Sequence, residues 1–232
     1  MNDLFVIGLW RVDAKYNFES YIRMLPLVLR RIHQEAIQSD RKIKVVIATD
    51  KEGIKRAKIN DPAKFVEIGL NDLPPVPSVS EPCGLKLGWM LSSEKMNGLN
   101  QVWANKIFLM DEISRRFGTS ESNVVWCDAG LKQFNKNFPI EYFKKFDQIQ
   151  PGKVYSNRYE NFDRVKHCRC NIPHHIRAGV IACHRDFVHD FSRLFSKHMG
   201  RVSENCGSWD EETILSSIHI DNPGLFKTWQ EL

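Results

Sequence analysis

The chain has 232 residues, 42% hydrophobic and 26% charged, which suits a globular protein with a buried core and argues against a disordered one. No apolar run approaches the roughly 20 residues of a membrane-spanning helix, so no membrane span is expected. A net charge of +5 and a pI near 8.9 favour anionic ligands, but the basic residues do not form the clustered stripe of a dedicated nucleic-acid-binding protein.

The first residues and the cysteines predict a cytoplasmic location. The chain begins without the basic start of a signal peptide, and the apolar run at residues 4–10 is too short for the hydrophobic part of one. Reduced thiols are therefore expected for the six cysteines.

Short apolar runs predict the strands of a sheet. The continuous apolar run at residues 4–10 is typical of a strand that is buried on both faces, and the mostly apolar residues 43–48 predict a second buried strand. The β-branched and aromatic residues at 124–126 predict another strand, bounded by Asn123 and Gly130. In chain order, the predicted strands are residues 4–10, 43–48, 65–68, 123–130, an edge strand at 154–156, and 179–183.

Apolar residues at helical spacing predict helices between these strands. In the first helix they recur from Tyr21 to Ile32, and Pro26 predicts a late start or a kink. The other predicted helices are residues 85–117 with a break at Asn97-Gly98, 138–146, 185–198, and 209–218 with Ser208 as cap and Glu211 completing a capping box. The proline-rich residues 73–82 predict an extended connection, and regular structure is expected to stop at Pro223-Gly224.

The order of these elements predicts an α/β fold in one domain, residues 1–232, with a mixed, mostly parallel sheet flanked by helices on both faces. Asp128 stands where its strand ends, and in open α/β sheets ligands bind just beyond the carboxyl ends of the strands. A carboxylate there can hold a cation or a hydroxyl group. The structural alternative is a turn aspartate after a buried strand.

Three short motifs occur in a characteristic order. Asn105-Lys106 leads to the strand VWCD at 125–128, RAGVI follows at 177–181, and WDEE follows at 209–212. In this order they resemble the nucleotide-diphospho-sugar glycosyltransferases of GT-A fold. Within that class the chain is most similar to the HtrL/YibB-like group, whose acidic motif looks like W-x-D-A-G.

The resemblance implies a GT-A-like (Rossmann-like) fold and a hexosyltransferase-like glycosyltransferase. Such an enzyme moves a sugar from a nucleotide-diphosphate donor to a hydroxyl acceptor, a glycan in the first place. Asp210, Glu211 and Glu212 then resemble the acidic group near the acceptor hydroxyl, where one carboxylate acts as base. The residues that the resemblance places around the nucleotide sugar are Trp10, Thr49, Asp50, Lys106, Arg177, Ala178 and Gly179.

The resemblance also implies a divalent metal ion, Mn²⁺ or Mg²⁺, held by Asp128. Gly130 stands where the family pattern has a second acid. Water or another side chain would complete the metal site, with His219, His174 and His175 as candidates, or no metal is used.

Two other interpretations of the GT-A-like features stay open. The missing second acid favours a decayed binding module, although the retained Lys106 and Asp128 argue against it. Aromatic residues interleave with basic residues at 155–169, a pattern that also suits stacking and phosphate contacts, so a modified base in DNA is a further acceptor.

A structural zinc site is a separate hypothesis. His167, Cys168 and Cys170 precede His174-His175, and Cys206 could join from further along the chain. The C-x-C spacing lacks the usual two-residue gap of zinc sites and argues against this interpretation.

Overall fold

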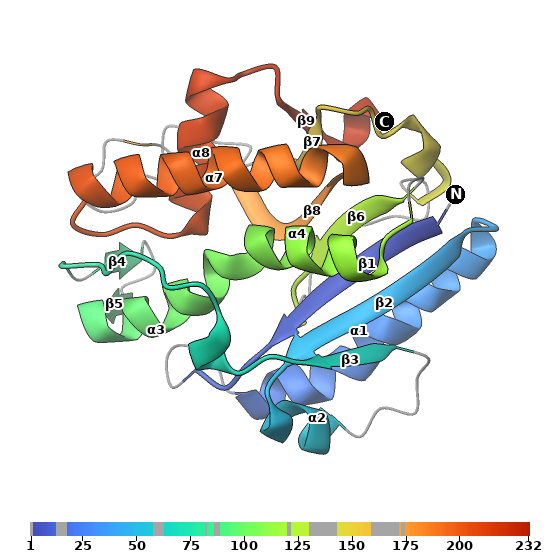
Figure 1. Ribbon diagram of the computed structural model, residues 1–232, viewed down its shortest axis with the longest axis horizontal. Coiled ribbons are helices and arrows are strands. Elements are labelled where there is room, and N and C mark those ends of the chain that lie inside the picture. The colour runs from blue at the N-terminus through green and yellow to red at the C-terminus, as the bar shows by residue number, and fades with distance from the viewer. Residues whose placement is uncertain are drawn as a thin grey trace.

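In the part of the chain that the structure describes, a seven-stranded sheet has the order β3-β2-β1-β6-β8-β7-β9 (Figure 1). The structure is a computed structural model that describes residues 2–12, 18–57, 63–81, 83–85, 89–119, 122–129, 143–158, 172 and 175–232. The strands are β1 (Asn2–Leu9), β2 (Lys42–Thr49), β3 (Lys64–Glu67), β6 (Asn123–Cys127), β7 (Val154–Arg158), β8 (Ile176–His184) and β9 (Phe226–Thr228).

The strand pairing confirms a mixed, mostly parallel sheet. β1 pairs in parallel with β2 and β6, β2 with β3, and β7 with β9. Only β8 runs against its neighbours β6 and β7 among these strands. The carboxyl ends of β1, β2 and β6 therefore meet at one edge, as the sequence predicts for a ligand site.

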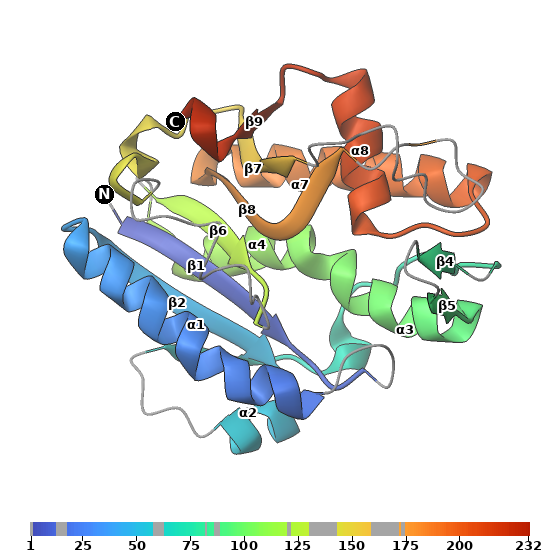
Figure 2. The same cartoon turned by 180° about the vertical axis from the view of Figure 1, so that it is seen from behind.

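Helices cover both faces of the sheet, as predicted (Figures 1 and 2). α1 lies on one face, and α4 and α7 lie on the other. The helices are α1 (Phe18–Gln38), α2 (Lys51–Ala57), α3 (Ser93–Trp103), α4 (Asn105–Phe117), α7 (Arg185–Asn205) and α8 (Glu211–Asp221), with single 3-10 turns η1 (Leu70–Asp72), η2 (Phe146–Gln148) and η4 (Trp229–Glu231). No helix among the described residues is long and apolar enough to cross a membrane.

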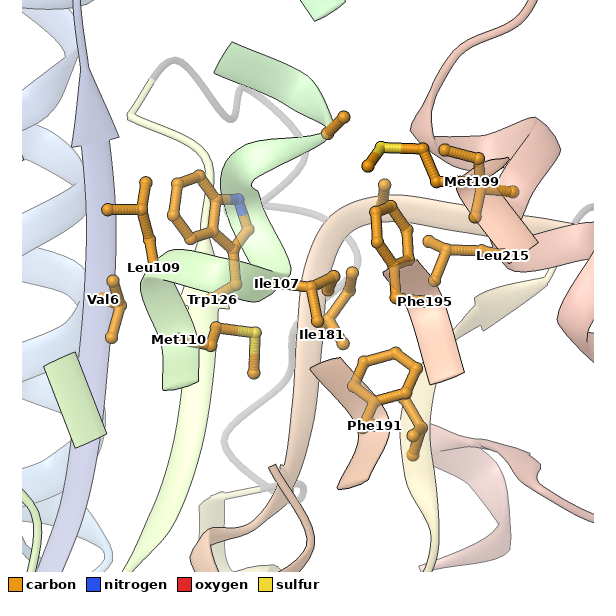
Figure 3. Packing of buried hydrophobic residues seen from close by; sticks show 14 of the residues in the cluster. Val6, Ile107, Leu109, Met110, Trp126, Ile181, Phe191, Phe195, Met199 and Leu215 are labelled. Carbon is orange, nitrogen blue, oxygen red and sulfur yellow. The ribbon is translucent and has the colours of Figure 1, made fainter. Parts of the chain in front are cut away.

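Alternation along β1 divides the core into two layers. Leu4 and Val6 join the cluster on the α4 and α7 face, whereas Phe5 and Ile7 join the cluster beneath α1. Figure 3 shows the first cluster, in which Val6 lies near Trp126 and side chains of α4. A strand buried on both faces explains why the sequence shows a continuous apolar run here.

The region 85–117 differs from the prediction at two points. Residues 83–85 and 89–91 form a separate antiparallel hairpin, β4 (Cys83–Leu85) and β5 (Trp89–Leu91), rather than the start of a helix. α3 runs without a break through Asn97-Gly98, and the helices divide at Ala104 instead. Asn97 is tied to a neighbouring segment, since its side chain accepts a hydrogen bond from the Val79 N–H at 2.6 Å.

Pro26 lies inside α1, so the predicted late start is wrong. The proline is exposed, and water can therefore satisfy the carbonyl that loses its helical partner. Of the predicted helix at 138–146, the first five residues lie outside the described part, and Phe143 and Lys144 are helical. Residues 73–81 form neither helix nor strand, as expected of a connection, and Pro82 lies outside the described residues.

The end of the chain continues in regular structure beyond Pro223-Gly224, contrary to the prediction. β9 adds to the sheet beside β7, so β7 is not an edge strand. Phe226 and Trp229 are buried in the two core layers, which explains why the segment is ordered against the sheet.

Candidate active site

A pocket opens at the carboxyl edge of β1 and β6. It encloses about 580 Å³ of empty space, including open solvent at its mouth. Its walls are largely aromatic, with Trp10, Phe18, Tyr21, Trp103 and Trp126, and its charged lining residues are Lys106 and Asp128. The pocket thus joins a large apolar surface to one ammonium and one carboxylate, as small-molecule sites commonly do.

Lys106 lies in the first turn of α4 and holds two acids together. Its Nζ is 3.0 Å from Asp128 Oδ1, 3.3 Å from Asp128 Oδ2 and 2.8 Å from Glu211 Oε1. It also donates to the Ala178 carbonyl at 3.4 Å. We call Lys106, Asp128 and Glu211 the carboxylate–lysine cluster. Burial opposes the charge of Lys106, but the two carboxylates outweigh it and raise its pKa, so the ammonium persists.

Asp128 follows β6 and is fixed by its neighbours. Its backbone N–H donates to the Gly179 carbonyl at 3.0 Å, and the Trp126 indole N–H donates to Oδ1 at 2.7 Å. Strand alternation predicts that Trp126 and Asp128 face the same side, and this contact confirms it. The Asp128 side chain remains 32% exposed, so one carboxylate of the cluster reaches the pocket.

The three consecutive acids at the start of α8 have different contacts. Asp210 caps the helix, because its Oδ1 accepts from Thr213 N and Thr213 Oγ1, both at 2.8 Å. The predicted cap at Ser208 with Glu211 is therefore wrong. Glu212 Oε1 accepts from the Ala178 N–H at 3.0 Å, which ties α8 to the start of β8.

Glu211 is the acid that faces Lys106. Burial is the main cause that raises the pKa of Glu211 to about 8, against the opposing effect of Lys106, while Asp210 and Glu212 raise it further. A carboxyl group with a pKa in this range exchanges its proton near neutral pH. Ala178 and Gly179 lie beside the cluster, through their carbonyl contacts with Lys106 and Asp128, and their role around the nucleotide sugar stays a prediction. Alternation along β8 directs Arg177 to the other side of the strand from Ala178.

Thr49 and Asp50 stand at the end of β2, next to β1, but they do not line the pocket. The buried Thr49 hydroxyl donates to the Leu9 carbonyl. Asp50 accepts from the Gly53 N–H at 2.7 Å, as an N-terminal cap of α2 does. Their role around the nucleotide stays a prediction. Trp10 does line the pocket, and its indole N–H donates to the Ile68 carbonyl at 2.9 Å.

The described contacts do not bring His219 to Asp128. His219 lies eight residues after Glu211, about 12 Å further along α8. Its ring contacts His175 and Phe226, at centroid distances of 5.6 and 5.9 Å, and burial lowers its pKa. Among the described residues no group of three or more His, Cys, Asp or Glu side chains could hold a metal ion. Gly130 and His174 lie outside those residues.

The cysteines change two expectations. Cys206 is disulfide-bonded, so the expectation of reduced thiols is wrong for this residue, and it offers no free thiolate to a zinc site. The other residues of the zinc hypothesis before His175 lie outside the described part of the chain. Cys127 and Cys183 are free and buried, as their apolar surroundings predict.

Sequence reasoning missed the glycine that shapes the pocket. A Cβ at Gly8 would lie 2.5 Å from Trp126 Cη2 and 2.7 Å from Trp10 Cζ3, so only glycine leaves room for both rings. An isolated glycine inside the apolar run 4–10 was the available signal, because it often marks a close approach. Trp103 and Tyr21 carried no such signal, since helical spacing alone does not tell pocket from core.

The fold is similar to that of a solved xylosyltransferase, and two further solved enzymes match with lower scores. Mouse xyloside xylosyltransferase 1 in its apo form matches with a TM-score of 0.55 and 12% identity, over 98% of this chain and 85% of that chain. Galactosyltransferase LgtC in complex with donor and acceptor sugar analogues has a TM-score of 0.49 at 10% identity, over 98% of this chain and 73% of its own. CMP:2-keto-3-deoxy-manno-octonic acid synthetase complexed with CTP has a TM-score of 0.46 at 10% identity, over 98% and 89%.

No protein-family model matches the sequence, and no curated protein matches it either. The HtrL/YibB-like group therefore stays a prediction. The likeness to the xylosyltransferase concerns the fold, and it confirms the predicted GT-A-like arrangement of a mixed, mostly parallel sheet with helices on both faces.

Proposed function

We propose that the chain is a glycosyltransferase that moves a sugar from a nucleotide-diphosphate donor to a hydroxyl acceptor. One observation carries the proposal: a partly exposed Asp128, braced by the buried ammonium of Lys106, lines an aromatic pocket at the carboxyl edge of the parallel strands. The fold of the xylosyltransferase supports it. A hexose as the transferred sugar and a glycan as the acceptor are the finer parts of the proposal.

Lys106 offsets one carboxylate charge of the cluster, so a diphosphate at this edge of the sheet meets one net negative charge rather than two. Two unit charges about 4 Å apart attract by roughly 4 kcal/mol at an effective dielectric near 20, before desolvation is counted. The contacts of Nζ with Asp128 and Glu211 fix the ammonium in advance, so little reorganisation is needed when the diphosphate binds.

An acceptor hydroxyl needs a base within hydrogen-bond reach. Asp210 has the contacts of a helix cap, so we expect its main contribution to be stability. Glu211 has a pKa of about 8, close to neutral pH, but it faces Lys106. Glu212 accepts a hydrogen bond from the start of β8. We therefore keep Glu211 and Glu212 as the candidates for the base and separate them by substitution to glutamine.

Mn²⁺ or Mg²⁺ remains part of the proposal. Magnesium is commonly held by one or two carboxylates together with substrate phosphates, and Asp128 is a partly exposed carboxylate in the pocket. The ion would neutralise charge on the diphosphate when bound. Because the described residues offer no group of three ligands, we expect the metal to bind together with the donor and not to the free protein.

A thermal-shift screen with UDP, GDP, CMP and their sugars, with and without Mn²⁺, tests the proposal. A ligand at 100 times its dissociation constant adds about 2.7 kcal/mol of stability. Mn²⁺ alone should give no shift, and nucleotide with Mn²⁺ should give the largest one. If no nucleotide binds and no common donor releases its nucleotide diphosphate, the decayed binding module is the better interpretation.

DNA as acceptor ranks below a glycan. The interleaved aromatic and basic residues at 159–169 lie outside the described part of the chain. Tyr155, the first aromatic residue of that pattern, is 2% exposed and packs at 6.2 Å from the Trp229 ring, so it cannot stack on a base. Salt-sensitive binding to duplex DNA would favour this acceptor.

The cytoplasmic location stays a prediction, against which the Cys206 disulfide favours an oxidising compartment. Thiol labelling of the protein isolated under alkylating conditions distinguishes the two. A Cys206 that reacts without prior reduction would support the cytoplasm.

A further inference from the structure

We propose that Trp126 is a positioning residue for Asp128. Its indole N–H donates to Oδ1 of that carboxylate and leaves Oδ2 free to meet the nucleotide-sugar ligand. The inference rests on the proposed function. It assigns Trp126 a role beyond its packing in the core. Trp126 is 1% exposed, and Figure 3 shows it near Val6, Leu109 and Met110 in the core layer beneath α4.

The two oxygens of Asp128 have different partners. Oδ1 accepts from Trp126 Nε1 at 2.7 Å and lies 3.0 Å from Lys106 Nζ, so two donors occupy it. Among the described residues, Oδ2 has only the longer contact with Lys106, at 3.3 Å. A carboxylate oxygen accepts about two hydrogen bonds. Oδ2 therefore keeps the capacity to meet a ligand in the pocket that Asp128 lines.

The position of the ring is determined by its surroundings. Val6 pairs with Trp126 across β1 and β6, and Gly8 lies two residues further along β1. The missing Cβ of Gly8 gives the indole its place, since a Cβ there would be 2.5 Å from Cη2. On the other side Lys106 Nζ lies 5.9 Å from the ring centroid. The ring cannot shift without disturbing β1 or Lys106, so its N–H is a fixed donor.

Packing and positioning make different demands on residue 126. A phenylalanine would satisfy the apolar contacts but has no N–H to donate. Buried tryptophans usually find a partner for this group, and a backbone carbonyl would serve for stability alone. Here the partner is Asp128, the carboxylate of the carboxylate–lysine cluster whose side chain is about a third exposed. The hydrogen bond therefore orients a group that a ligand in the pocket can contact.

A double-mutant cycle tests the inference with the nucleotide that gives the largest thermal shift in the wild type. Trp126→Phe should weaken its affinity about 10-fold, which is about 1.4 kcal/mol, in titration calorimetry. In the background of Asp128→Ala the same substitution should have no further effect, because the group that it positions is gone. Trp229→Phe is the matched control: it makes the same change at a buried site in the other core layer and should leave affinity within twofold.

Equal losses from Trp126→Phe in both backgrounds, or wild-type affinity of the single variant, would overturn the role of Trp126 and leave the proposed function standing. A wild type that binds none of the nucleotides overturns both. The hydrogen bond itself is read on folded protein by the indole ¹H–¹⁵N resonance of Trp126. That resonance should move in Asp128→Ala while the Trp229 resonance stays, and an unmoved Trp126 signal refutes the contact even if Trp126→Phe does not fold.

Discussion

Replacing Lys106 with methionine removes a buried ammonium while keeping most of the side-chain length. Nζ lies within 3.3 Å of three carboxylate oxygens, two from Asp128 and one from Glu211. Removing one partner of a buried ion pair costs about 3–5 kcal/mol, because the other charge stays buried. Such a loss is a large share of the about 5–15 kcal/mol that stabilises a typical domain.

The size of this loss should depend on pH, because Glu211 can escape the penalty by binding a proton. The pKa of Glu211 is raised from 4.5 to about 8 in the folded protein. A raised folded pKa means that its contribution to stability is present below about pH 4.5 and is lost as the pH rises through about 8. Up to about pH 8 the wild type and Lys106→Met lose stability in parallel. Above about pH 8 the wild type loses no further stability through Glu211. The variant, in which the pKa of Glu211 is higher still because Lys106 is absent, continues to lose about 1.4 kcal/mol of stability per pH unit.

Urea denaturation followed by tryptophan fluorescence at pH 6, 8 and 9.5 measures the difference. The destabilisation should be below about 3 kcal/mol at pH 6, where the lost pair is with the partly exposed Asp128, and should grow above pH 8. In the double variant Lys106→Met/Glu211→Gln, the destabilisation should not increase above pH 8. Lys227→Met, which breaks an exposed ion pair with Glu231, should cost less than about 1 kcal/mol at every pH. A loss for Lys106→Met that is the same at pH 6 and pH 9.5 would refute the assignment of Glu211 as its titrating partner.

Three further substitutions separate binding, packing and capping. Asp128→Asn should abolish the Mn²⁺-dependent part of the nucleotide thermal shift and leave the folded protein intact, and a retained shift would remove Asp128 from the metal site. Gly8→Ala should cost about 1–3 kcal/mol by overpacking in urea denaturation; Trp126→Phe should restore part of it, since phenylalanine lacks the atom 2.5 Å from the new Cβ. Asp210→Ala should cost about 0.5–2 kcal/mol of stability as a lost cap with little change in turnover, whereas Glu212→Gln should lower turnover if Glu212 is the base.

The elements that the sequence predicts well are those whose signal is local. Residues 4–10 and 45–48 are apolar on both faces because helices cover both sides of the sheet, so composition alone reveals them. The position of Asp128 follows in the same way, since the end of a buried parallel strand is also the edge where ligands bind. Its contact with Trp126 follows from alternation over two residues.

The elements that the sequence does not predict depend on partners far along the chain. β9 consists of three residues, and only its pairing with β7 makes it a strand. The hairpin of β4 and β5 has the same origin, because each strand exists through the other. The cap of α8 is Asp210 and not the predicted Ser208. A serine and an aspartate two residues apart offer the same capping chemistry, and only the backbone geometry decides between them.

The charges of the carboxylate–lysine cluster determine whether a nucleotide-sugar donor needs a positive charge to bind with it. With all three groups ionised, one ammonium faces two carboxylates, so the cluster carries a net negative charge. A nucleotide diphosphate adds further negative charge at the same edge of the sheet. In a partly buried site this repulsion is only weakly screened by salt, so binding needs a compensating positive charge. A divalent ion supplies it directly, and a proton taken up by Glu211, whose pKa is about 8, supplies part of it. Nucleotide affinity that rises with Mn²⁺ at pH 9 more steeply than at pH 6 would follow from this balance, since the proton is available only at the lower pH.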